Sequence, residues 1–423
     1  MPSGARARQG QAVRVTRRGW AVAAIALLLY FFANQTQVGW LYVLSALAAG
    51  LWLTTLGMPG RMLRGLAAGR RVLTPLAAGS DSSADLELHA GQPITLELNF
   101  YNSSRQPVLL LRAVEPCALA PFPDQNQIVT IPAIAGRSAA RVRIETTCAR
   151  RGWFPFAPLT VETRAPFGLS RASRALAATG PDGVLVFPEF RELAQLDLFD
   201  QQPAVETSAA RLGAAGEFIG VRDFRPGDPR RNVHWRSTAR AGRLIVKEFA
   251  AETQPALTMA LDLRAGSALG PQGDTLELGI KVAATLARYA HRRSLPFSLL
   301  TNSRTWPAPP SPLSWWGLMS YLARLEAEGE APFDESLRHL PPGTFVAAIL
   351  PAPDSGVLGP LADLRRAGLA VMAIIVDPSP FIPGSAGHRY GIEARRLAAE
   401  LDSAGVAVRL VGPDPDWERV LAE

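Results

Sequence analysis

Cysteine is scarce in this chain, since only Cys117 and Cys148 occur among its 423 residues. Two cysteines exclude a multi-disulfide scaffold and a four-cysteine zinc site. The two could pair in an oxidising compartment, but the charge pattern described below places them in a reducing one. We therefore expect two free thiols.

Charged residues are also few, at 19% of the chain, whereas apolar residues make up 48% and part of that excess lies before residue 60. The formal net charge is +7. A positive balance can indicate nucleic acid, but arginines beside the apolar segments account for much of it by pairing with anionic lipid headgroups. Because no recognised DNA- or RNA-binding motif is present, we do not predict a nucleic-acid partner.

Reaction signatures are missing as well. The sequence has no phosphate-cradling GxxxxGK[ST] loop, so the chain is not a P-loop ATPase and any nucleotide energy must come from a partner. No serine or cysteine nucleophile motif accompanies His234, the histidine that could act as a general base. We predict no catalytic residue and no cofactor, and expect a protein that is not an enzyme.

Two uncharged apolar segments near the N-terminus, residues 19–33 and 38–58, are separated by the polar stretch 34–37. As a helix the second segment would run about 31 Å, enough for the hydrocarbon core of a bilayer. The first is shorter, but Arg17 and Arg18 can snorkel to the headgroups. The pattern predicts a transmembrane hairpin. A cleaved signal peptide is the alternative, although a second apolar segment follows almost at once.

Arginines flank this hairpin on both outer sides, whereas its connecting loop has no basic residue. The positive-inside rule therefore predicts a multi-pass protein of the cell membrane, with a basic N-terminus at residues 1–18 and with both termini and the soluble domains in the cytoplasm. The flanking arginines are Arg6, Arg8, Arg14, Arg17 and Arg18 before the hairpin and Arg61, Arg64, Arg70 and Arg71 after it.

The remaining chain, too long for a single hydrophobic core, divides by pattern. Residues 85–190 alternate apolar and polar positions in short runs with turn residues between them, which predicts an antiparallel β-sandwich. Residues 191–216 form a polar connector. Across 255–423, continuous apolar runs alternate with helical stretches, which predicts a parallel sheet covered by helices on both faces.

Between these parts, residues 217–249 read EFIGVRDFRPGDPRRNVHWRSTARAGRLIVKEF. This segment resembles the signature of the bacterial "domain of unknown function 58" family, in which an RxYRPGD run is followed by a basic pair, an HW or DW pair and a basic strand. Phe224 replaces the usual tyrosine, Val221 a leucine, and Asn232 a basic residue.

The resemblance extends to the layout. It implies an N-terminal transmembrane helical hairpin, a β-sandwich-like domain and a C-terminal α/β doubly wound domain of von Willebrand A type. It also implies an accessory or scaffold protein with no known reaction. The partners it implies are a MoxR-type AAA+ ATPase and a transglutaminase-like membrane protein, besides membrane lipid.

The signature offers two interpretations. Its arginines can present forks to carboxylates or phosphates of a partner, or they can pair with nearby acids and lock two domains together. We expect Trp235 to be a packing anchor. The signature residues singled out are Glu217, Arg222, Arg225, Pro226, Gly227, Asp228, Arg231, His234, Trp235 and Arg240.

Two alternative functions depend on the same segment. One is a hydrolase or transferase that uses His234 with Asp223 or Asp228; against it, neighbouring strand positions such as 234 and 235 would point to opposite faces. The other is binding of anionic lipid or nucleic acid through the arginines, which strong salt dependence would reveal.

A metal site is the last candidate. Magnesium-binding A-type domains carry aspartate, serine and serine at alternate positions after the first strand, because a hard cation needs several oxygen ligands. Here Asp262, Arg264 and Gly266 occupy those positions. Because Arg264 would put positive charge where the ion belongs, we predict no metal and expect Asp262 to be an ion-pair partner or turn residue.

Overall fold

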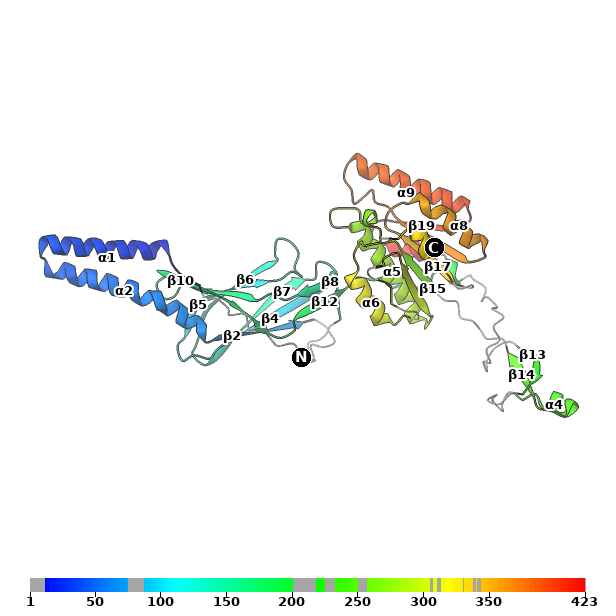
Figure 1. Cartoon of the computed structure of the whole chain (residues 1–423), viewed down its shortest axis with the longest axis horizontal. Coiled ribbons are helices and arrows are strands. Elements are labelled where there is room, and N and C mark those ends of the chain that lie inside the picture. Colours follow the sequence, from blue (N-terminus) through cyan, green and yellow to red (C-terminus); the bar gives the residue numbers. More distant parts are fainter. Residues whose placement is uncertain are drawn as a thin grey trace. The chain divides into compact units, whose positions relative to one another are not determined.

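The computed structural model describes residues 12–74, 87–200, 218–224, 233–249, 257–304, 307–309, 313–329, 331–337, 340 and 344–422. The chain divides into two compact units, Met1–Phe187 and Pro188–Glu423, and each is treated by itself (Figure 1).

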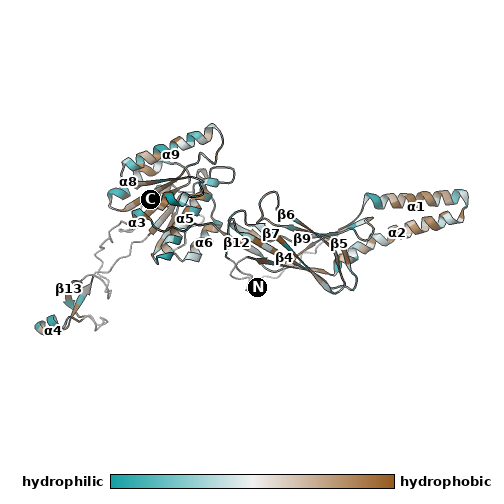
Figure 2. Ribbon diagram, turned by 180° about the vertical axis from the view of Figure 1, so that it is seen from behind, coloured by the Kyte–Doolittle hydropathy of each residue, from teal (hydrophilic) through white to brown (hydrophobic). Residues whose placement is uncertain are grey.

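Two antiparallel helices begin the first unit, α1 (Arg17–Thr36) and α2 (Gly39–Arg64). Both are long and apolar enough to cross a membrane, and Figure 2 shows them largely in the hydrophobic colour. Their apolar side chains point outward: Leu27 is 71% exposed and Leu47 is 65% exposed. Apolar surface on this scale fits lipid better than water.

Three sheets form the rest of this unit, and most of their strand pairs are antiparallel, as predicted. The orders are β1-β10-β9-β5-β6, β11-β2-β4-β7 and β3-β12-β8. Among the described strands of this unit, only β11 with β2 and β12 with β3 pair in parallel. The strands are β1 (Ala12–Val15), β2 (Leu66–Leu73), β3 (Leu88–His89), β4 (Pro93–Asn102), β5 (Val108–Pro116), β6 (Asn126–Ile134), β7 (Ser138–Thr147), β8 (Gly152–Pro155), β9 (Leu159–Thr163), β10 (Ser170–Leu176), β11 (Ala178–Thr179) and β12 (Gly183–Phe187).

The helix pair and the sheets pack as one body. Strands β1 and β2 directly precede and follow the hairpin, so both ends of the hairpin enter the sheets. Met62 and Leu63, in the last turn of α2, belong to the same hydrophobic core as Leu98 and Val161 of two different sheets. Arg174 of β10 donates to the Leu63 carbonyl at 2.9 Å.

The second unit contains five parallel strands in the order β16-β15-β17-β18-β19. Every residue of β15, β17 and β18 is buried, which confirms the parallel sheet predicted from continuous apolar runs. Helices α5 and α6 pack together, as do α8 and α9. The elements are α3 (Asp197–Asp200), β15 (Leu257–Leu261), α5 (Asp274–Arg292), β16 (Phe297–Thr301), α6 (Trp315–Arg324), α7 (Phe333–Ser336), β17 (Phe345–Leu350), α8 (Leu358–Arg366), β18 (Ala370–Val376), α9 (Ser385–Ser403), β19 (Ala407–Val411) and α10 (Trp417–Ala422).

The signature segment adds a small motif to this unit. Strands β13 (Phe218–Asp223) and β14 (Ile245–Phe249) pair antiparallel, and α4 (Trp235–Ala241) lies between them in sequence.

Candidate functional site

The strand order marks one edge of the parallel sheet as a place for ligands. From β15 the chain crosses to β16 on one side, and then returns past β15 to β17 on the other side. In open α/β sheets, ligands bind at the carboxyl ends of the strands where the order reverses in this way. Asp262 follows β15, Asn302 follows β16 and Asp354 lies in the loop after β17.

Asp262 is the buried centre of this edge, with no exposed surface. Its carboxylate accepts hydrogen bonds from Arg264 Nε (2.9 Å) and Nη2 (2.8 Å), and from Asn302 Nδ2 (3.0 Å). Asn302 in turn accepts from the Leu263 amide at 2.8 Å. A buried carboxylate requires partners of this kind, because an unpaired buried charge is very costly.

Arg264 bridges two loops. Its Nη1 lies 2.8 Å from Asp354 Oδ2, while its Nη2 bonds Asp262, and its side chain is 33% exposed. Burial lowers the pKa of the guanidinium, but the hydrogen bonds and charge of Asp262 and the charge of Asp354 outweigh this, so the net pKa is raised. The arginine therefore holds a fixed positive charge between two carboxylates.

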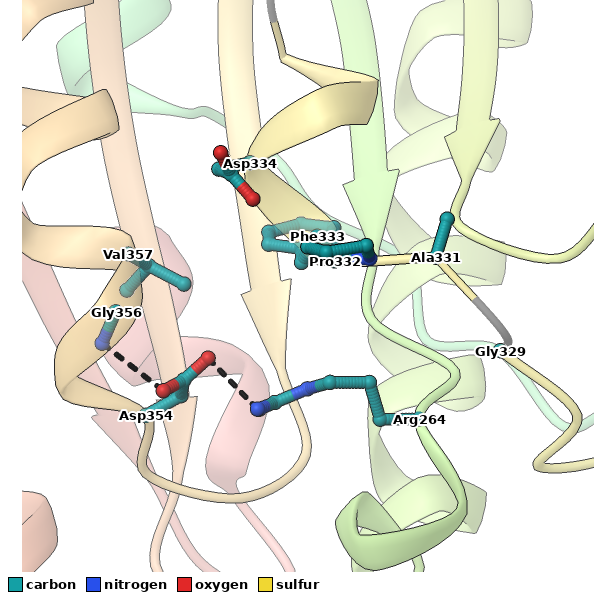
Figure 3. Close-up of a pocket in the computed structure, with 9 residues that line it drawn as sticks. All are labelled: Arg264, Gly329, Ala331, Pro332, Phe333, Asp334, Asp354, Gly356 and Val357. Atoms are coloured by element: carbon teal, nitrogen blue, oxygen red, sulfur yellow. Dashed lines mark hydrogen bonds and ion pairs between the residues drawn. The ribbon is translucent and has the colours of Figure 1, made fainter.

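A pocket of about 420 Å³ opens beside this bridge (Figure 3). Asp354 also accepts from the Gly356 amide at 2.9 Å, which fixes its carboxylate at the pocket wall. Gly329 approaches the backbone of Arg264 so closely that a Cβ at position 329 would lie 2.7 Å from the Arg264 backbone nitrogen. The lining residues are Arg264, Gly329, Ala331, Pro332, Phe333, Asp334, Asp354, Gly356 and Val357.

The pocket combines apolar walls with more negative than positive side chains. Phe333 is 2% exposed and lines it beside Pro332, while Asp334 adds a carboxylate to that of Asp354. Across the described ranges, no group of three or more histidine, cysteine, aspartate or glutamate side chains could hold a metal ion. Asp262 is the ion-pair partner of Arg264, which is the role that the sequence favoured.

Only part of the predicted signature can be placed. Arg222 lies on β13 and donates to the Asp223 carbonyl at 3.0 Å, and the Asp223 carboxylate lies 3.2 Å from Arg243. Arg240 is exposed on α4. The residues that lie outside the described part of the chain are Glu217, Arg225, Pro226, Gly227, Asp228 and Arg231.

His234 and Trp235 differ from the prediction. They stand at the start of α4 rather than on a strand: His234 is the N-cap of this helix and Trp235 is its first residue. Its Nδ1 accepts from the Ser237 amide at 3.2 Å and lies 2.8 Å from the Ser237 hydroxyl. Trp235 is 69% exposed, so the expectation of a packing anchor is wrong for the conformation described.

Sequence reasoning missed the partnership of Arg264 with Asp354 and the role of Asn302. Each of these residues follows a buried apolar run, and that was the available signal. Which runs become neighbours depends on strand order, and no local pattern records that order.

Comparisons with known proteins add one firm finding. No curated protein matches the chain. Among solved structures, a GH20 exo beta-N-acetylglucosaminidase from Vibrio harveyi is 11% identical with a TM-score of 0.21, over 82% of this chain and 75% of that one. A GH26-CBM35 beta-(1,4)-mannanase from Podospora anserina is 12% identical with a TM-score of 0.16, over 82% and 77%. Neither likeness bears on fold or activity. Residues 220–311, which include most of β13 and all of α4, β14, β15, α5 and β16, match the family described as "Protein of unknown function DUF58", and the chain therefore carries a DUF58 family domain.

Proposed function

We propose that this protein is a membrane-anchored adaptor whose C-terminal α/β domain, of von Willebrand A type, docks a partner protein at the carboxyl edge of its sheet. The Arg264 bridge carries this proposal. Open α/β sheets usually bind small ligands in the crevice at this edge. In this protein the ion pairs of Arg264 with Asp262 and Asp354 occupy that crevice. What remains open beside it is a pocket suited to side chains of another protein.

The chemistry of this pocket indicates what the partner presents. Asp334 and Asp354 place two carboxylates at the rim, that of Asp354 in its ion pair with Arg264, while Pro332 and Phe333 give the pocket apolar walls. A lysine or arginine with its aliphatic stem fits such a surface, since the stem packs on the apolar wall and the head meets the carboxylates. The partner surface is therefore basic at its centre.

The partner that the family resemblance suggests is a MoxR-type AAA+ ATPase, with a transglutaminase-like membrane protein as a second. The chain has no P-loop of its own, so in this proposal the ATPase supplies the energy and the adaptor supplies location. Helices α1 and α2, which are long and apolar enough to cross a membrane, are the proposed anchor. In this proposal the positive-inside rule, applied to the arginines outside the hairpin, assigns the soluble parts to the cytoplasm.

One observation favours a second candidate function, contact with anionic lipid through the signature. Trp235 is exposed, and Arg236 and Arg240 are exposed on the same short helix. An aromatic ring beside arginines suits a headgroup surface. Loss of vesicle binding on Trp235→Ala, together with strong salt dependence in the parent chain, would support this candidate.

The adaptor proposal is tested by crosslinking the full chain in its native membrane and identifying the captured proteins. Asp334→Lys reverses the charge of the pocket rim. Asp402→Lys makes the same change at the end of α9, which runs back from the carboxyl edge of β18, so it serves as the matched control. We expect the parent chain and the control to capture an AAA+ ATPase, and Asp334→Lys to lose it.

A third variant, with Arg225, Asp228 and Arg231 changed to alanine, separates the pocket from the signature. Loss of the ATPase in this variant alone would move the docking surface to the signature. Equal capture by every variant would contradict docking at either place.

A further inference from the structure

The turn between β9 and β10, residues 164–168, lies against the first turn of α1. The Thr16 hydroxyl donates to the Gly168 carbonyl at 2.8 Å, and the Thr16 amide donates to the Leu169 carbonyl at 2.9 Å. Gly19 permits this approach, because a Cβ there would lie 2.1 Å from the Leu169 oxygen. The turn is therefore level with the start of the first apolar helix.

The direction of β10 shows which way the turn faces. Ser170, at the start of β10, bonds the Thr55 carbonyl in α2, and Arg174, four residues later, bonds the Leu63 carbonyl. Strand and helix thus run the same way, from the apolar part of α2 toward the core of the sheets. The turn that precedes β10 is consequently the end of this sheet nearest to the apolar part of the hairpin.

Apolar side chains stand exposed at this end. Phe167, in the turn, is 57% exposed, and Leu110, on the adjacent strand β5, is 56% exposed. Leu110 belongs to the same end of the sheet, because the Thr163 hydroxyl donates to the neighbouring Leu109 carbonyl at 2.7 Å. Exposure of apolar side chains to water is unfavourable, whereas contact with lipid would remove them from water.

Exposed arginines accompany the two apolar side chains. Arg17 and Arg18 open α1, and Arg164 opens the turn, where it is 55% exposed while it pairs with Glu162 at 2.8 Å. Phe167 and Leu110 are therefore apolar side chains surrounded by arginines, and they lie beside a helix of membrane-spanning length. Surfaces with this composition enter the headgroup layer of anionic membranes.

We infer that the 164–168 turn is a second membrane contact, in which Phe167 inserts into the headgroup region of an anionic bilayer while the neighbouring arginines meet lipid phosphates. The inference deepens the proposed membrane anchoring and rests on it. Such a contact would add to the hairpin a second attachment of the first unit to the bilayer, at the 164–168 end of the sheet.

The chain offers a matched control for the test. Phe122 is 87% exposed in the loop between β5 and β6, at the opposite end of the same sheet. We would place an environment-sensitive fluorophore on Phe167→Cys, Phe122→Cys and Leu47→Cys in separate full-length proteins. The native thiols should not compete, because both are buried and burial raises the pKa of Cys148 to about 11; labelling of the unsubstituted chain checks this.

Each protein is reconstituted into phosphatidylcholine vesicles containing phosphatidylglycerol and a spin-labelled quencher lipid. We expect strong quenching at position 47, clear quenching with a blue shift at 167, and no quenching at 122. A probe at 167 that behaves like the one at 122, while 47 is quenched, overturns the inference and leaves the anchor intact. Failure of quenching at 47 overturns the anchor and the inference together.

Discussion

Each unit pairs an arginine with a buried carboxylate, but the arginine is buried in the first unit and partly exposed in the second. In the first unit Arg70 is 4% exposed and pairs with Glu115, which is fully buried, at 2.7 Å. Its guanidinium also lies 4.4 Å from the centre of the Phe156 ring. In the second unit Arg264 is 33% exposed and reaches two aspartates at the edge of a pocket. The first pair belongs to a core, whereas the second fills a ligand position.

The electrostatics of the two arrangements differ accordingly. Burial raises the pKa of the Glu115 carboxyl, against the opposing effect of Arg70. At the pocket, burial lowers the pKa of Arg264, but the hydrogen bonds that Arg264 donates to Asp262 and the charges of Asp262 and Asp354 outweigh burial, so this pKa is raised. Desolvation thus dominates in the core, and ion pairing dominates at the edge, where solvent reaches the network.

The largest effect is expected from Arg70→Met, which leaves the Glu115 carboxylate buried without its partner. Breaking one side of a buried ion pair typically lowers the free energy of unfolding by about 3–5 kcal/mol. Urea unfolding of the full chain in detergent measures this loss. The double variant Arg70→Met, Glu115→Leu should regain most of it; equal instability of the single and double variants would contradict the assignment.

Arg264→Ser should cost less, about 2 kcal/mol, because the network is partly exposed and Asn302 still donates to Asp262. It also removes the cation that Arg264 supplies and puts a hydroxyl in its place. We therefore expect millimolar Mg²⁺ to raise the melting temperature of this variant and not that of the parent chain. A parent chain that responds equally would show that Arg264 does not stand where a cation would bind.

Asn302→Ala should lower the free energy of unfolding by about 1–3 kcal/mol, because it removes partners from Asp262, from the Leu263 amide and from the Ala331 carbonyl. Thr301→Ala, at the preceding position, changes a partly buried hydroxyl that contacts Tyr321 and serves as the control. If both variants lose the same stability, Asn302 has no special place in the network.

The smallest effect concerns Asp200, whose carboxylate accepts from the Tyr289 hydroxyl at 2.6 Å and pairs with Arg293. Burial raises the pKa of Asp200. The hydrogen bonds from Tyr289 and the Leu196 amide and the charge of Arg293 lower it by more than burial raises it, so the net pKa is lowered. A lowered pKa means that this stabilisation is complete above the unfolded value of about 4 and is lost as the pH falls through the folded value.

Asp200→Asn should therefore cost about 1 kcal/mol at neutral pH and progressively less in acid. Thermal unfolding of both proteins as the pH is lowered from neutrality measures this convergence. Parallel curves with no convergence in acid would contradict the role assigned to the carboxylate.

The fold was predictable where burial imposes a period on the chain. The runs that became β15, β17 and β18 are buried at every position and apolar at all but Thr258, because both faces of the parallel sheet are covered. Strand β1 was not predicted, since its four residues resemble the rest of a basic N-terminus and become a strand only by pairing with β10. Local sequence does not specify such a distant partner.

The candidate site was predictable only in its separate residues. Asp262 was expected to be an ion-pair partner or a turn residue, and the structure pairs it with Arg264, two positions along the chain. Asp354 is distant in sequence and reaches Arg264 only because β17 lies beside β15. The role of His234 as a helix cap was missed for another reason. A cap depends on where the helix begins, and a helix of seven residues is too short for its sequence pattern to show this.

Binding of a purified MoxR-type AAA+ ATPase to the full chain in lipid nanodiscs tests the central claim most directly. The adaptor account predicts saturable binding to the parent chain and to Asp402→Lys, and a loss of at least about tenfold in affinity for Asp334→Lys, which corresponds to about 1.4 kcal/mol. Equal affinity for all three proteins, or no binding to any, would contradict docking at the carboxyl edge of the sheet.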